Sequence, residues 1–212
     1  MEKFAAGIFA AAVISILQPA NVSAQIEVPE DIYTWVQSTA RGDYWFNHQQ
    51  TGYFVDENGT IDLNIIIAPT ICIYDEIQIQ DVVQKRRWRM LPGSGYNNLI
   101  GRADYFRFDL TAGTVQIIER VDLDKNWAEL DKDTSGKPIK LSELSGKDVT
   151  CRFYRAILAW AKEHNKMMID RSWGNLSESD SKLKPEDMPI AKIPLPAGDE
   201  FDRTKEPMKK SL

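Results

Sequence analysis

The sequence predicts an α+β fold, in which an antiparallel sheet of about four to six strands is covered by a long C-terminal helix, with a short N-terminal helix and a flexible tail. Two patterns predict this fold. Apolar and polar residues alternate between residues 105 and 123, with the period of a half-buried strand. Apolar residues recur every three or four positions between residues 147 and 168, with the period of one helix face.

Length and composition are those of an ordinary soluble protein. The chain has 212 residues, of which 43% are hydrophobic and 27% are charged. Its 26 basic and 31 acidic residues give a net charge of -5, which argues against nucleic acid as a partner. Contact with any other polyanion would have to come from a local cluster of cations.

The first 24 residues have the form of a signal peptide. Phe4–Leu17 is almost wholly apolar, and Val22 and Ala24 lie where signal peptidase requires small side chains. The apolar run is shorter than the roughly 20 residues of a membrane-spanning helix. We therefore expect cleavage after Ala24 and export to the periplasm, the cell surface or the medium, with no membrane span left after cleavage.

The mature chain is expected to open with the short helix. Residues 28–31 place a proline and two acids in a first helical turn, where both are favourable. Ile32, Trp35 and Val36 would continue it as an apolar stripe.

Strand patterns follow. Residues 44–50 and 53–55 are rich in aromatic side chains, and residues 56–59, Asp-Glu-Asn-Gly, are typical of a tight turn. Residues 60–73 alternate and then become continuously apolar, as a central strand does. Pro69 within that run requires a bulge or an edge position.

Residues 74–90 fit two structures. Ile77 and Ile79 have the spacing of a strand, whereas Ile79 and Val82 have the spacing of a helix, for which Asp75 would be the cap. We prefer the helix of the two.

The central hairpin is the clearest strand pair. Phe106, Phe108 and Leu110 share one face of the first strand, and Gly113 supplies the turn. Ile118 and Glu119 fall out of phase in the second strand, which predicts a bulge or a locally two-sided sheet there.

The predicted long helix covers Lys147–Met168, after a capping-box sequence at residues 145–148. From residue 174 onward, prolines and mixed charges replace apolar periodicity. The sequence therefore predicts one domain over residues 25–173 and a disordered tail over residues 174–212.

The two cysteines allow two interpretations. An oxidising compartment outside the cytoplasm would permit a disulfide between Cys72 and Cys151. Both could equally be buried thiols that pack as small hydrophobic residues.

Catalytic and metal-binding patterns are weak. A nucleophile needs a base beside it, and the two histidines, His48 and His164, lie in apolar surroundings that suit structural roles. Residues 131–136 match the first half of a calcium loop but lack the glutamate at its twelfth position. We therefore nominate no catalytic residue, metal ligand or cofactor.

One basic cluster stands out, at residues 85–89. Arginines supply charge and forked hydrogen-bond donors, and a tryptophan supplies a flat stacking surface. The ligand-binding candidates are Arg86, Arg87, Trp88 and Arg89. In an exported protein the natural polyanion is an anionic surface polymer. The alternative is that Trp88 packs inward and the arginines are solvated or paired.

The order of aromatic strand, Asp-Glu-Asn-Gly turn, apolar strand and the hairpin from residues 104–108 to residues 117–125 resembles small exported bacterial domains of the surface-adhesin E type. The resemblance covers residues 43–168 and implies an α+β fold and adhesion. It carries no catalytic motif and no binding residue.

Three functions remain from the sequence. The leading hypothesis is a non-enzymatic envelope or secreted binding protein, adhesin-like or polyanion-binding, whose partner is an anionic surface polymer or an envelope protein. The first alternative is a hydrolase that acts on envelope glycans through two carboxylates. The second is a structural subunit that docks through its C-terminal tail.

Overall fold

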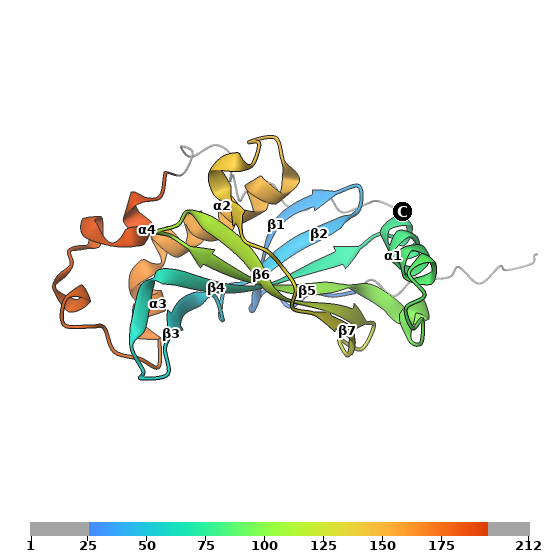
Figure 1. Cartoon of the computed structure of the whole chain (residues 1–212), viewed down its shortest axis with the longest axis horizontal. Helices are drawn as coiled ribbons and strands as arrows, with labels where there is room; N and C mark the ends of the chain where they lie inside the picture. Colours follow the sequence, from blue (N-terminus) through green and yellow to red (C-terminus); the bar gives the residue numbers. More distant parts are fainter. Residues whose placement is uncertain (1–25, 195–212) are drawn as a thin grey trace, which may run out of the picture.

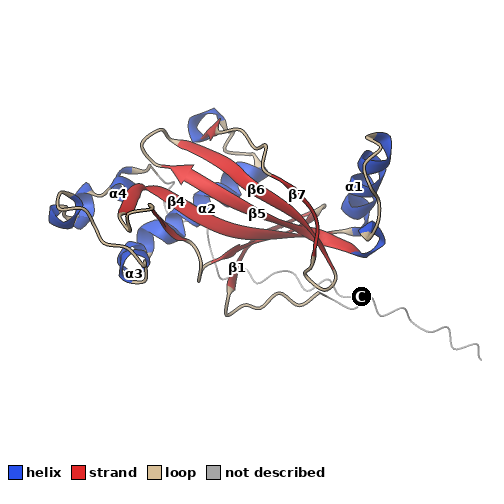
Figure 2. Cartoon of the chain, turned by 60° about the horizontal axis from the view of Figure 1, so that its bottom comes forward, coloured by secondary structure: helices blue, strands red, loops and turns tan. Residues whose placement is uncertain are grey.

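The computed structural model describes residues 26–194, which form one eight-stranded antiparallel sheet with helices at its face and ends (Figures 1 and 2). The order of the main strands is β1-β2-β4-β5-β6-β7, while β3 pairs with β4 and β8 with β6. The strands are β1 (Tyr33–Thr39), β2 (Gly42–Asn47), β3 (Gly52–Val55), β4 (Ile61–Tyr74), β5 (Leu99–Asp109), β6 (Thr114–Asp124), β7 (Glu129–Asp133) and β8 (Ile139–Lys140). The helices are α1 (Glu76–Trp88), α2 (Val149–Glu163), α3 (Asn165–Asp170) and α4 (Pro189–Lys192).

Strand β4 lies in the middle because one long apolar run serves three neighbours. It pairs with β5 along one edge, and with β3 and then β2 along the other. Pro69 lies after the last residue paired with β3 and before the first paired with β2. Its missing N–H therefore interrupts neither of those two ladders.

The hairpin of β5 and β6 confirms the predicted alternation. Phe106 and Phe108 are buried at 3% and 0% exposure, and Gly113 has the positive φ of 63° that its turn needs. Tyr105 pairs with Glu119 and Phe106 with Ile117, so Ile118 is bulged out. Of the two alternatives for this position, the structure has the bulge.

Helix α2 packs its apolar side against this sheet. Asp148 caps it by accepting a hydrogen bond from the Thr150 backbone N–H at 3.0 Å. Edge-to-face ring contacts join Phe106 to Phe153 and to Tyr154, with centroids 6.0 and 5.0 Å apart. A smaller apolar cluster covers another part of the sheet: Val28, Ile71, Ile100, Val121 and Leu123.

The predicted architecture is wrong in four respects. The sheet has eight strands, rather than four to six. The predicted long C-terminal helix is a 15-residue helix in mid-chain, because the chain bends at His164 and continues as the short α3. His164 stacks on Trp160, with ring centroids 4.5 Å apart, and has non-helical φ and ψ of -106° and 20°.

The predicted N-terminal helix is also wrong, because residues 30–32 form a turn and Tyr33–Thr39 form β1. Trp35 pairs with Trp45, and the register shifts before Gln37 pairs with Tyr44. The shift leaves Val36 as an extra residue. This bulge interrupts the two-residue alternation and places apolar residues at spacings that resemble a helix.

The flexible tail predicted from residue 174 is wrong as far as residue 194. Ile190 is buried at 1% exposure in the core beneath α2, and the Ile61 N–H donates to the Asn175 carbonyl at 2.9 Å. Other partly buried side chains of this segment pack on the same core: Leu176, Leu183, Met188 and Ile193. The predicted signal peptide and the remainder of the predicted tail lie outside the described residues.

Candidate binding site at the end of helix α1

Helix α1 begins directly after β4 because Asp75 caps it. The Asp75 carboxylate accepts a hydrogen bond from the Gln78 backbone N–H at 2.7 Å, which satisfies one of the free donors of the first turn. The preferred interpretation of residues 74–90 as a helix is therefore confirmed, and the strand alternative is excluded.

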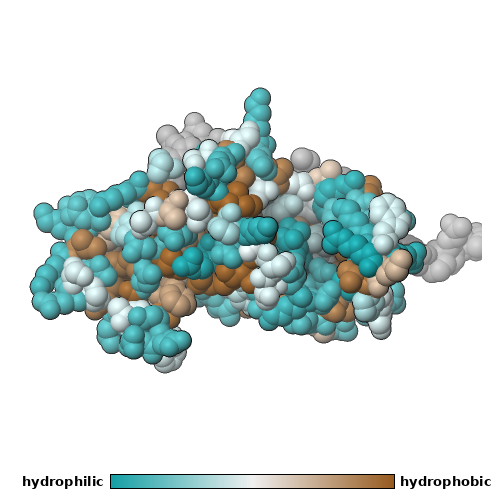
Figure 3. All heavy atoms as spheres, in the orientation of Figure 1, coloured by the Kyte–Doolittle hydropathy of each residue, from teal (hydrophilic) through white to brown (hydrophobic). Residues whose placement is uncertain are grey.

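Helix α1 contributes little to the core. None of its residues is buried, and it lies at one end of the sheet rather than across its face (Figures 1 and 2). Its last turn and the residues after it expose large apolar side chains: Trp88 at 78%, Met90 at 93% and Leu91 at 44%. In Figure 3 the end of the molecule that carries α1 is mainly hydrophilic, with hydrophobic residues interspersed.

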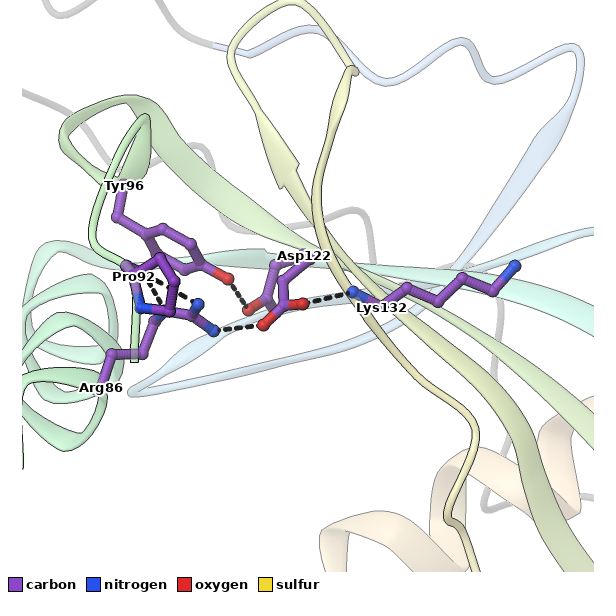
Figure 4. Close-up of polar contacts among 6 residues, drawn as sticks. Arg86, Pro92, Tyr96, Asp122 and Lys132 are labelled. Atoms are coloured by element: carbon purple, nitrogen blue, oxygen red, sulfur yellow. Dashed lines mark hydrogen bonds and ion pairs between the residues drawn. The ribbon is translucent and has the colours of Figure 1, made fainter. Parts of the chain in front are cut away.

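Arg86 attaches the end of α1 to the sheet (Figure 4). Its Nε and Nη2 donate to the Pro92 carbonyl at 3.1 and 2.9 Å, and its Nη1 lies 2.5 Å from Asp131 Oδ2 on β7. The guanidinium also lies over the Tyr96 ring, 4.0 Å from its centroid. With only 11% of its side chain exposed, Arg86 is a structural anchor and has few donors left for a ligand.

Tyr96 connects this anchor to the next strand. Its ring is buried, and its hydroxyl donates to Asp122 Oδ2 on β6 at 2.7 Å. Burial, together with this hydrogen bond to a carboxylate, raises the pKa of Tyr96 well above its usual value. Charged side chains continue across the strands, since the Asp104 carboxylate lies 2.9 Å from Arg102 Nε and 2.7 Å from Arg120 Nε.

The other candidates of the basic cluster face solvent. Arg87 and Arg89 are exposed, as is the neighbouring Lys85, and no ion pair or side-chain hydrogen bond joins these three to any residue that the structure describes. Trp88 does not pack inward, because 78% of its surface is exposed. The structure therefore separates Arg86 from Arg87, Trp88 and Arg89.

A groove of about 470 Å³ runs between α1 and the loop that follows it. Apolar side chains and amides form most of its lining, and the two arginines supply its charge. The residues are Ile79, Gln80, Val83, Gln84, Arg86, Arg87, Leu91, Gly93, Tyr96 and Asn97. No aspartate or glutamate lines this groove.

No protein-family model, curated protein or solved structure matches this chain. The resemblance to surface-adhesin E domains thus stays an expectation from the sequence. Within residues 26–194, no helix is long and apolar enough to cross a membrane.

The cysteines do not form the disulfide that the sequence allowed. Cys72 and Cys151 are both free and buried, at 5% and 2% exposure. Burial raises the pKa of the Cys72 thiol to about 11, so this thiol stays protonated at neutral pH. Both side chains act as small apolar residues of the interior.

The histidines and the calcium-loop sequence have structural roles. His48 Nδ1 lies 3.1 Å from Thr34 Oγ1, and His164 stacks on Trp160. Residues 131–133 belong to β7 rather than to a loop, and Asp131 pairs with Arg86. Within the described chain, no group of three or more histidine, cysteine, aspartate or glutamate side chains could hold a metal ion.

No sequence pattern indicated that Tyr96, Asp122 and Asp131 belong to the site. Only the fold brings them together, since they lie after α1, on β6 and on β7. The spacing of Arg86 along α1 offered one signal, because Ile79, Val83 and Arg86 fall on one helix face that turns toward the groove.

Proposed function

We propose that this protein is an exported, non-enzymatic binding protein that takes an anionic ligand at the end of α1. The observation that carries the proposal is the exposure of Lys85, Arg87 and Arg89 without a partner among the described residues, beside an exposed Trp88 and a groove. Export rests on the predicted signal peptide in residues 1–24.

Electrostatics support an anionic ligand at this place. The chain as a whole carries a net charge of -5, so its overall field does not attract a polyanion. Three adjacent unpaired cations reverse that sign locally, and arginine guanidinium groups bind sulfate or phosphate oxygens through forked hydrogen bonds. The tryptophan adds a flat face on which a sugar or another ring can lie.

Glycan hydrolysis gains no support from the groove. A glycosidase needs two carboxyl groups on either side of the bond that it cleaves. The lining of this groove includes none, and the nearest acid of the anchor, Asp131, is already paired with Arg86. That hydrogen bond lowers the pKa of Asp131, so the carboxyl group stays ionised. Asp131 is therefore unsuited to donate a proton.

The test is binding of heparin, a soluble sulfated polymer, to the full chain by titration at several salt concentrations. The variant Arg87→Glu/Arg89→Glu is compared with Lys137→Glu/Lys184→Glu, which changes the net charge equally at two exposed lysines outside the groove. We expect affinity to fall with salt, and to fall about tenfold or more in the first variant only. Equal affinity in the two variants would refute a site at α1.

A further inference from the structure

We propose that the anionic ligand at the end of α1 is a lipid surface, on which this end of the protein docks without crossing the bilayer. This inference rests on the proposed function and names the ligand class of the same site. It starts from a property that a soluble polyanion does not explain, namely the large apolar side chains among the cations.

The exposed apolar residues are concentrated in one short segment. Trp88, Met90 and Leu91 are 78%, 93% and 44% exposed within four consecutive positions. Single exposed apolar residues are ordinary, but a contiguous group marks a surface that is covered in use. A sulfated polymer would pair with the arginines and leave Met90 in water, whereas the acyl-chain boundary of a bilayer would accept it.

The backbone presents these side chains on an ordered turn. The Arg89 N–H donates to the Lys85 carbonyl, Met90 to Arg87 and Leu91 to Arg86, at 3.1, 3.0 and 3.0 Å. Met90 itself has a left-handed φ of 54°, which ends the helix. The anchoring of Arg86 to Pro92 then holds the segment after the turn. Docking therefore requires little ordering of the chain.

The surrounding charges suit an anionic rather than a neutral surface. Arg87 and Arg89 flank Trp88, and Met90 follows Arg89 directly. Proteins that insert aromatic and aliphatic side chains at the headgroup level place cations beside them in this way, where the cations meet anionic lipids. Tryptophan in particular prefers the membrane–water interface. Since the protein carries a net charge of -5, repulsion elsewhere would orient this end toward the membrane.

The experiment is cosedimentation of the exported form, which begins at Gln25 after the predicted cleavage, with phosphatidylglycerol–phosphatidylcholine vesicles and with phosphatidylcholine vesicles. Trp88→Ala/Met90→Ala is compared with Trp173→Ala/Met167→Ala, which removes the same two residue types from exposed positions away from α1. We expect anionic vesicles to bind more tightly by about tenfold or more, and the first variant alone to lose most of that affinity. The predicted signal peptide is left out because its apolar segment, Phe4–Leu17, would bind vesicles of either composition.

Heparin distinguishes this inference from the proposed function. The variant Met90→Ala should keep heparin affinity within about threefold, because the cations and Trp88 remain, and should bind anionic vesicles more weakly. The lipid inference would be overturned if that variant bound anionic vesicles with wild-type affinity, or if the protein bound both vesicle types equally. Heparin binding in the same experiment would still support the anionic site. Self-association through Trp88 and Met90 without vesicle binding would also overturn it. If Arg87→Glu/Arg89→Glu bound both heparin and anionic vesicles with wild-type affinity, the proposed function itself would be refuted.

Discussion

Helices α1 and α2 have the same kind of N-terminal cap but lie in opposite environments. Each is capped by an aspartate, Asp75 for α1 and Asp148 for α2. Helix α2 buries seven of its residues against the sheet, among them Phe153, Ile157 and Trp160, whereas α1 buries none. Helix α2 is held by the hydrophobic effect. The polar contacts that hold α1 are those of Arg86 and an ion pair in which Asp81 lies 3.7 Å from Arg41.

The difference shows which surfaces the fold requires. Removal of apolar area from water is the main source of stability, so the residues of α2 are committed to the core. Helix α1 is attached through Arg86 and leaves Arg87, Trp88 and Arg89 free of structural duties. A surface that the fold does not need is where a binding function is expected.

Matched isoleucine truncations should separate the two helices most strongly. Ile157 is 0% exposed in α2, so Ile157→Ala should lower the free energy of unfolding by about 2–5 kcal/mol through lost burial and a cavity. Ile77 is 55% exposed in α1, so Ile77→Ala should change it by no more than about 0.5 kcal/mol. Urea unfolding measures both, and similar losses would mean that α1 is part of the core.

Truncation of two neighbouring arginines on α1 should have the next largest difference in effect on the free energy of unfolding. Arg86→Ala removes hydrogen bonds to Pro92 and Asp131, and we expect a loss of about 1–2 kcal/mol, concentrated in α1 and the loop after it. Arg87→Ala should stay within about 0.5 kcal/mol, because Arg87 has no such contact in the described chain. Amide exchange of residues 76–98 reports the loss. Faster amide exchange in Arg87→Ala than in Arg86→Ala would mean that Arg87, and not Arg86, holds the end of α1.

Acid should loosen α1 by a smaller amount. The hydrogen bond from Arg86 lowers the pKa of Asp131 below its usual 3.8. A carboxylate with a lowered pKa stabilises the folded state above its unfolded pKa, and this contribution is lost as the pH falls through the folded value. Amide protection in α1 should therefore decline below about pH 4. Asp131→Asn should remove that dependence, and an identical decline in this variant would point to another carboxylate.

The central hairpin was predictable because its signals are local. Alternation places Phe106 and Phe108 on one face, and a glycine turn fixes the register. The N-terminal helix was predicted wrongly because one bulge at Val36 disturbed the alternation of β1. The length of α2 was also wrong, since the stacking of His164 on Trp160 bends the chain where the apolar spacing continues.

The basic cluster of the site was visible in the sequence, but the separate structural role of Arg86 within it was not. The three arginines looked equivalent until the fold placed Asp131 and Tyr96 beside Arg86 alone. Those contacts join α1 to β7 and to the loop before β5, and no local pattern encodes such long-range pairs. Ordering of residues 174–194 was missed for the same reason, because Ile190 is buried by partners distant in the chain.

Hydrogen exchange of the full chain with and without heparin is the most direct test of the claim that α1 binds while α2 holds the fold. We expect heparin to slow exchange in residues 85–98 and to leave α2, Val149–Glu163, unchanged. Slowed exchange in α2 with none at the end of α1 would contradict the assignment of the binding site to α1.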